Sequence, residues 1–166
     1  MSTETIKKAR EGDRQAFAQL YLKHKDSLYR YAYFKLGNAH DAQDAVADCV
    51  ADAYAGISRL KSEKAFVSWL FKILYRKCCA VLSQNSTRKD VLSLDDGVDL
   101  PVTDDHLASE LEEALALLSA EEKDIVLLSV ISGYKTREIA EMLGIKHSTV
   151  RSKLSRALAK MKNYLE

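Results

Sequence analysis

The chain has 166 residues, with 25 Lys and Arg against 24 Asp and Glu and a formal net charge of +1. This length allows one or two small domains, and the near-zero total charge does not by itself indicate a nucleic-acid partner. The charge is unevenly distributed: residues 1–85 carry 14 basic against 9 acidic side chains, residues 86–110 carry 2 against 7, and residues 144–166 carry 6 against 1. Two basic ends therefore flank an acidic middle.

The sequence shows no signal for membrane insertion or secretion. No apolar run is long enough to span a bilayer, and the opening MSTETIKKAREGD lacks the apolar core of a signal peptide, so we expect a cytoplasmic protein. The cysteines Cys49, Cys78 and Cys79 have no CxxC spacing. We interpret them as small apolar residues in a reducing compartment, with a zinc or redox site as the minor alternative.

The first part of the chain predicts helices in succession. A short helix is expected over residues 3–10, and a long one begins at Asp13 and ends at Gly37-Asn38. The apolar stripe of the long helix comprises Ala16, Phe17, Leu20, Tyr21, Leu28, Tyr31 and Ala32.

Two further helices complete this part. A helix over residues 40–55 has its inward positions at i, i+3 and i+4 spacing, and these are Ala42, Ala45, Val46, Cys49, Val50 and Ala53. A helix over residues 63–83 is expected to bury Phe66, Trp69, Leu70, Ile73 and Leu74. On the same helix, Phe71 and Tyr75 are predicted to be more exposed.

The helical pattern then stops and returns. Residues 86–106 contain the only Pro and many Asp, without periodicity, which favours a flexible acidic linker. Helical spacing resumes at Leu107, and Ser119-Ala-Glu-Glu122 is a capping box that opens the next helix. We therefore predict an all-α fold of two small helical domains, at 1–85 and 107–166.

The helix over residues 40–55 carries a row of carboxylates opposite its apolar stripe. Asp41, Asp44, Asp48 and Asp52 recur every three or four residues and so share one face. Such a row can be solvated, can hold a metal, or can dock a basic partner helix. A metal-dependent enzyme needs a second carboxylate cluster on a facing helix, and the pattern offers none, so docking is the preferred hypothesis.

Basic and aromatic residues are interleaved on the next helix and the loop before it. The basic ones are Arg59, Lys61, Lys64, Lys72, Arg76 and Lys77. Such side chains can follow a phosphate backbone, while aromatic faces stack on unpaired bases. This indicates a single-strand contact only if the chain has another DNA-binding element.

Residues 135–158, KTREIAEMLGIKHSTVRSKLSRAL, supply that element as a predicted helix-turn-helix. Thr136 is expected to cap the first helix, and Gly144 to end it in the left-handed conformation. The second helix is expected to bury Val150, Leu154, Ala157, Leu158 and Met161. Its opposite face presents hydroxyls and guanidiniums that suit groove edges and phosphates, on Ser148, Arg151, Ser152, Ser155 and Arg156.

The whole chain resembles the extracytoplasmic-function group of bacterial sigma factors. The resemblance rests on four stretches, GDRQAFAQLYLKHKDSLYRYAY at 12–33, DAQDAVADCVADAY at 41–54, FVSWLFKIL at 66–74 and the region 117–158. Ser119 stands where the family usually has Pro, and Lys146 where it often has Ser, which removes a helix cap. The positions where the family favours Asn and Asp hold Arg76 and Ala80.

The resemblance implies a transcription initiation factor that is not an enzyme and needs no cofactor, metal or small-molecule substrate. It implies core RNA polymerase (clamp helices and flap) and promoter DNA as partners, and an anti-sigma factor as regulator. The clamp-binding residues are then Asp41, Gln43, Asp44, Asp48 and Asp52. The residues contacting the opened −10 strand are Ser58, Arg59, Lys61, Lys64, Lys72 and Arg76. The −35 reader comprises Thr136, Arg137, Lys146, His147, Ser148, Thr149, Arg151, Ser152, Lys153, Ser155 and Arg156.

Two alternatives remain open at this point. One is a helix-turn-helix regulator that binds DNA but not polymerase. The other is an all-α metal-dependent phosphohydrolase that uses the aspartate row, which the missing second carboxylate cluster disfavours.

Overall fold

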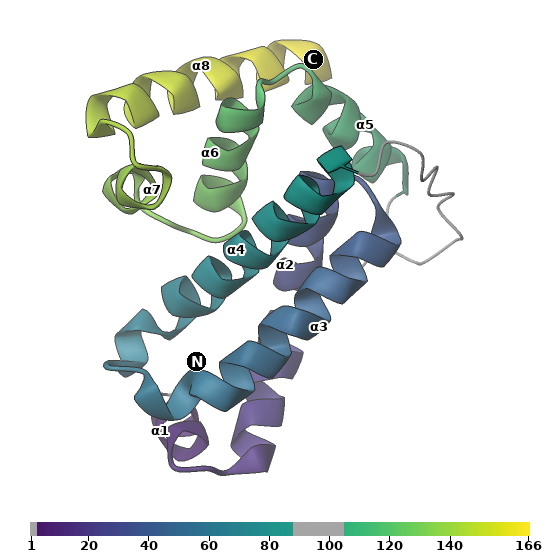
Figure 1. Cartoon of the computed structure of the whole chain (residues 1–166). Helices are drawn as coiled ribbons and strands as arrows, with labels where there is room; N and C mark the ends of the chain where they lie inside the picture. Colours follow the sequence, from purple (N-terminus) through teal and green to yellow (C-terminus); the bar gives the residue numbers. More distant parts are fainter. Residues whose placement is uncertain (1–2, 88–104) are drawn as a thin grey trace. The chain divides into compact units, whose positions relative to one another are not determined.

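The computed structural model describes residues 3–87 and 105–166, which are organised as helices with short connections. The chain divides into two compact units, built from helices α1 to α4 and from α5 to α8 (Figure 1). The predicted all-α fold is confirmed, while the domain limits at 85 and 107 stay a prediction. Within the described residues, no helix combines the length and apolar character needed to cross a membrane.

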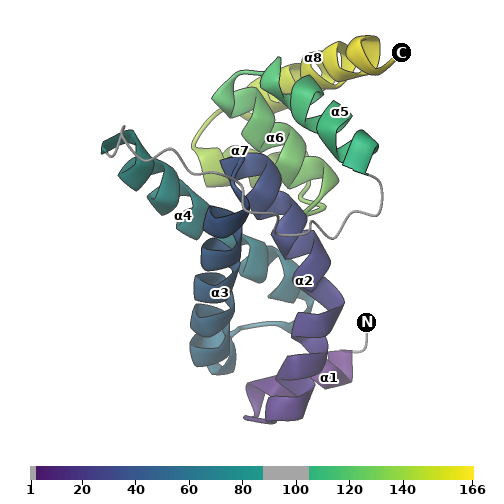
Figure 2. The same ribbon diagram turned by 90° about the vertical axis from the view of Figure 1, so that its right-hand side faces the viewer.

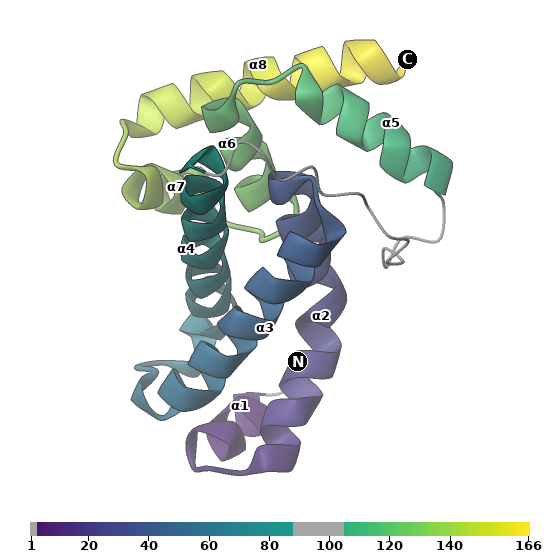
Figure 3. The same cartoon turned by 45° about the vertical axis from the view of Figure 1, so that its right-hand side comes forward.

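The first unit is a three-helix bundle with a short helix at one end. It comprises α1 (Thr3–Arg10), α2 (Arg14–Leu36), α3 (Ala39–Gly56) and α4 (Phe66–Thr87), with the 3₁₀ turns η1 (Ile57–Arg59) and η2 (Glu63–Ala65) between α3 and α4. Helices α2, α3 and α4 all pack against one another, and α1 packs against the start of α2 and both turns (Figure 3).

Local signals place the ends of α2 and α3 as predicted. The Asp13 carboxylate accepts hydrogen bonds from the amides of Gln15 and Ala16, at 3.0 and 3.1 Å, and so caps α2. Gly37, with φ of 71°, ends α2 in the left-handed region. The Asn38 side chain then accepts from the Asp41 amide at 2.8 Å and starts α3.

The core of the first unit differs from the prediction on α4. Phe71, predicted to be exposed, is only 1% exposed and meets Tyr31 edge-on with 6.0 Å between ring centroids. Trp69, predicted to be core, is partly exposed, and Tyr21 on α2 is 37% exposed. The two predictions on α4 were wrong because α4 packs against two helices, so its buried face is wider than one stripe. Tyr21 lies instead in the wall of a groove between α2 and α3.

The cysteines lie on α3 and α4, and Cys49 occupies the core position predicted for it. Cys49 and Cys78 are buried, and Cys79 is partly buried. Burial raises the pKa of the Cys49 thiol to about 12, and this thiol donates to the Leu70 carbonyl at 3.6 Å. Cys49 is thus a protonated, weakly nucleophilic core side chain at neutral pH.

The helices on both sides of the predicted linker are longer than expected. Helix α4 continues to Thr87, and α5 begins at Asp105, so residues 86–87 and 105–106 are helical rather than linker. Residues 88–104, which carry the remaining linker prediction, lie outside the described part of the chain.

The second unit has α8 packed across the other three helices (Figure 2). It comprises α5 (Asp105–Ala116), α6 (Ala120–Val130), α7 (Thr136–Leu143) and α8 (His147–Leu165). The predicted capping box of α6 is confirmed: the Glu122 amide donates to Ser119 Oγ at 3.1 Å, and the Ser119 amide donates to Glu122 Oε1 at 3.0 Å.

The apolar stripe of α8 is narrower than predicted. Val150 and Ala157 are fully buried, Leu154 and Met161 are partly buried, and Leu158 is 41% exposed. Leu158 lies at the edge of the apolar stripe of α8. The three shorter helices of this unit cover only a narrow part of the α8 surface.

Candidate protein and nucleic-acid interfaces

The aspartate row of α3 contacts α4 at both ends. Asp44, Asp48 and Asp52 are exposed, and Asp41 is partly buried. Asp41 accepts a hydrogen bond from the Asn85 side-chain amide at 3.1 Å, and Asp52 forms an ion pair with Lys77 at 2.8 Å. The hydrogen bond to Asp52 raises the pKa of the Lys77 amine. Asp44 and Asp48 are therefore the carboxylates of the row best placed to meet another molecule.

An apolar groove, which the sequence did not indicate, runs between α2 and α3 beside this row. It has a volume of about 810 Å³ and is lined by Phe17, Tyr21, Lys25, Asp26, Tyr29, Gln43, Val46, Ala47, Val50, Ala51 and Tyr54. The rings of Phe17 and Tyr54 lie 5.1 Å apart, and Tyr54 is 46% exposed. One sequence feature could have indicated the groove: Ala47, Ala51 and Tyr54 are further apolar positions of α3 outside its predicted core stripe.

The predicted single-strand residues all lie at the surface of the first unit. Ser58, Arg59, Lys61 and Lys64 are exposed in the connection between α3 and α4, and Lys72 and Arg76 are exposed on α4. Buried Ile57 and Leu60 anchor this connection. The structure thus presents a continuous segment of cationic side chains on a fixed base.

Contacts from α1 and within the connection hold this segment in place. Arg10 of α1 forms an ion pair with Glu63 at 3.0 Å, and Ser62 Oγ accepts from the Lys64 amide at 3.2 Å. Backbone hydrogen bonding and the nearby Arg10 lower the pKa of the Glu63 carboxyl. Glu63 therefore stays ionised and keeps its partner at neutral pH.

Trp69 is the aromatic side chain that lies with these cations. Trp69 and Arg59 line the same small surface hollow, together with Asp52 and Gly56. Tyr75, predicted to be more exposed, is partly exposed and packs against Lys35, whose amine lies 4.9 Å from the ring centroid. Trp69 and Tyr75 are both partly exposed, so a residue that the sequence pattern had assigned to the core also presents a ring at the surface.

Helices α7 and α8 form the predicted helix-turn-helix. Gly144, with φ of 70°, ends α7 and donates to the Ala140 carbonyl at 2.9 Å. The predicted cap at Thr136 is wrong, because Lys135 precedes the first turn and its amide donates to the Glu138 carboxylate at 2.9 Å. Thr136 Oγ1 instead lies 2.7 Å from His147 Nε2 and joins the starts of the two helices.

The exposed face of α8 brings most of the predicted DNA-contacting residues together. Exposed side chains there are Lys146, Ser148, Arg151, Ser152, Ser155 and Arg156, with Thr149 and His147 partly buried at the helix start. Arg137 is exposed on α7. Lys146 makes no side-chain cap, as predicted, so its charge stands at the helix N-terminus. Hydroxyls and cations on one helix face are what groove and phosphate contacts require.

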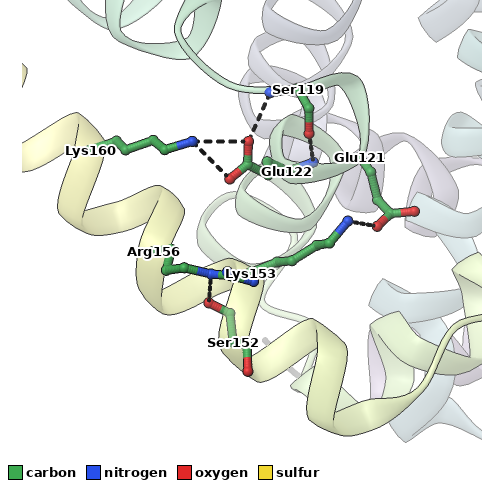
Figure 4. Close-up of polar contacts among 7 residues, drawn as sticks. All are labelled: Ser119, Glu121, Glu122, Ser152, Lys153, Arg156 and Lys160. Carbon is green, nitrogen blue, oxygen red and sulfur yellow. Dashed lines mark hydrogen bonds and ion pairs between the residues drawn. The ribbon is translucent and has the colours of Figure 1, made fainter.

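Lys153 lies apart from this face. Its amine donates to Glu121 in the first turn of α6, and Lys160 contacts Glu122 of the same turn at 3.4 Å (Figure 4). Hydrogen bonds to the Ser119 backbone and to Lys160 lower the pKa of the Glu122 carboxyl. The described residues contain no group of three or more His, Cys, Asp or Glu able to hold a metal ion.

Comparison with known proteins identifies the family. Residues 20–88 match sigma-70 region 2, and residues 108–161 match sigma-70 region 4. The chain is 31% identical over 158 residues to the ECF sigma factor SigM of Mycobacterium tuberculosis, covering 93% of this chain and 79% of that protein. It is 25% identical over 185 residues to the ECF sigma factor SigW of Bacillus subtilis, covering 99% and 97%.

Solved structures share the fold. The sigma factor RpoE of Bartonella quintana, in complex with the anti-sigma factor NepR, has a TM-score of 0.73 at 22% identity, covering 90% of this chain and 96% of that one. CnrH, in complex with the cytosolic domain of CnrY, has a TM-score of 0.71 at 23% identity, covering 98% and 96%. The chain belongs to the sigma-70 family and is an ECF-type sigma factor. It is an alternative sigma factor that directs transcription initiation.

Proposed function

We propose that each of the three surfaces described above has one task in promoter-specific initiation. Asp44 and Asp48 of the aspartate row, with the apolar groove between α2 and α3, bind the clamp helices of core RNA polymerase. The segment from Ser58 to Lys64, with Lys72 and Arg76, contacts the opened −10 strand. The exposed face of α8 reads the −35 element. The protein catalyses no reaction itself and acts in the cytoplasm, where polymerase and promoters are.

The observation that carries this proposal is the separation of opposite charges on fixed surfaces. Asp44 and Asp48 are exposed beside an apolar groove, which suits a protein partner with a basic edge. The cations around Arg59 and along α8 suit phosphates instead. Partly exposed Trp69 adds a ring on which an unpaired base can stack.

An anti-sigma partner is the second part of the proposal. Two proteins of the same fold were solved in complexes, RpoE with the anti-sigma factor NepR and CnrH with the cytosolic domain of CnrY. A partner of this kind controls the protein if it covers the clamp-binding or DNA-binding surfaces. It shifts the equilibrium only by its differential affinity for the covered state.

Reconstitution with core polymerase tests the proposal directly. The full-length protein is added to core enzyme and a genomic template, and the 5′ ends of the transcripts are sequenced. We expect starts that share a −35 and −10 pair and that disappear without the protein. DNA binding without polymerase binding would instead identify a helix-turn-helix regulator.

A further inference from the structure

Two carboxylates in the first turn of α6 hold lysines of α8 (Figure 4). Lys153 donates to Glu121 Oε1, and its side chain is 31% exposed. Lys160 lies 3.4 Å from Glu122 and is more open. In Figure 4 the side chains of both lysines extend from α8 toward the first turn of α6.

Lys153 stands next to the residues proposed to meet DNA. It follows Ser152 directly and is an i, i+3 neighbour of Arg156 on the helix surface. Arg156 itself stays on its own helix, where Nε donates to the Ser152 carbonyl at 3.3 Å, and its side chain is exposed. A Lys153 amine released from Glu121 would reach the same stretch of phosphate backbone, since its stem is long and flexible.

We propose that Glu121 limits the sequence-independent affinity of α8 for DNA, because it withdraws the Lys153 amine from the phosphate backbone. The inference rests on the proposed −35-reading role of α8. Phosphate contacts strengthen binding to every sequence alike, whereas base-edge contacts discriminate among sequences. Withholding one phosphate contact therefore weakens binding to all sequences by the same factor, and it leaves the discrimination made by the base readers unchanged.

Glu121 is a cleaner position for a test than Glu122. Glu122 accepts from the Ser119 amide and its own amide donates to Ser119, so it also forms the N-terminal cap of α6. Changing Glu122 would therefore disturb the helix start as well as the Lys160 pair. Glu121 pairs with Lys153 and takes no part in the Ser119–Glu122 capping box, so changing it leaves the cap of α6 in place.

The test is a salt titration with the full-length protein and a fluorescent random-sequence DNA duplex. For Glu121→Gln we expect tighter binding at low salt, and the slope of log K against log salt should steepen by about one unit, as for one added phosphate contact. Lys153→Gln should leave the slope unchanged. Glu121→Gln combined with Lys153→Gln should match Lys153→Gln alone.

The controls separate release of Lys153 from loss of negative charge. Glu141→Gln removes the same charge from an exposed position of α7 and should not change the slope. If Glu121→Gln steepens the slope equally in the Lys153→Gln background, general electrostatics explain the effect and the proposal is overturned. A loss of about one slope unit in Lys153→Gln alone would show that Lys153 already contacts DNA, which also overturns it.

The same titration distinguishes failure of the underlying function. If Arg151→Ala and Arg156→Ala both bind like the parent protein, the face of α8 is not the DNA reader. If these arginine variants bind more weakly while the Glu121 series is flat, the face is correct and only the role of Glu121 is refuted.

Discussion

Helices α3 and α8 carry rows of opposite charge in a similar arrangement. In each helix, one charged side chain pairs with a neighbouring helix. Asp52 at the end of the α3 row binds Lys77 of α4, and Lys153 beside the exposed face of α8 binds Glu121 of α6. Other members of each row stay exposed, with Asp44 and Asp48 on α3 and Arg151 and Arg156 on α8. Internal pairing therefore distinguishes the charges of each row, because Asp52 and Lys153 already have an oppositely charged partner within the protein.

The surroundings of the two rows differ, and this difference separates the expected partners. The α3 row borders an apolar groove with the aromatic rings of Phe17 and Tyr54. The α8 row is interspersed with the hydroxyls of Ser148, Ser152 and Ser155. Apolar area beside charge is typical of the core and rim of a protein interface, while hydroxyls among cations suit the polar edges of DNA.

Reversing the exposed part of the α3 row should have the largest effect. We expect Asp44→Lys combined with Asp48→Lys to weaken binding to core polymerase by several kcal/mol, because like charges would face each other at the interface. Both side chains are exposed, so the fold should change little. Binding of labelled protein to core enzyme measures the effect, with Glu11→Lys on the α1–α2 turn as the control. Parent-like affinity of the double variant would exclude the row from docking.

Truncating the exposed ring of the groove should have the next largest effect. Tyr54→Ala is expected to cost about 2 kcal/mol or more in polymerase binding, as for a central aromatic residue at an interface. Tyr54→Phe keeps the ring against Phe17 and should bind nearly as well as the parent in the same core-enzyme assay. Equal affinity of the Ala and Phe variants would mean that the groove does not face the polymerase.

The arginines on the exposed face of α8 provide the corresponding test of DNA binding. Arg151→Ala and Arg156→Ala should each weaken −35 binding by about 1–3 kcal/mol if the residue reads a base, with relaxed preference at one position. A phosphate-binding arginine would instead lose affinity evenly across sequences. Transcription from promoters with single −35 changes distinguishes the two roles. Unchanged transcription in both variants would contradict a reading role for this face.

The smallest effect on stability and on polymerase binding is expected for Asp52, which is already paired with Lys77. Asp52→Asn removes the partner of Lys77, and a partly exposed ion pair contributes at most about 1 kcal/mol to the free energy of unfolding. Denaturant unfolding measures this loss, and polymerase affinity should stay near that of the parent. If Asp52→Asn weakened polymerase binding as much as a change at Asp44, the whole row would act in docking and the comparison would need revision.

Local features of the chain were predictable because they depend on neighbours in sequence. Asp13, Gly37 and Ser119 begin and end helices through bonds to amides and carbonyls within a few residues. Gly144 ends the first helix of the helix-turn-helix for the same reason. The order of the helices, and the faces that carry like charges, therefore followed from periodicity and capping.

The sequence alone determined the all-α fold, the helix-turn-helix and the two charged rows, since each follows from residue spacing along one helix. Only the tertiary structure decided that Phe71 is buried while Trp69 is partly exposed, because that depends on how many helices contact α4. It also decided that Asp52 and Lys153 are paired, since their partners Lys77 and Glu121 lie on other helices. The groove beside Tyr54 exists only when α2 and α3 meet, so no single-helix pattern contains it.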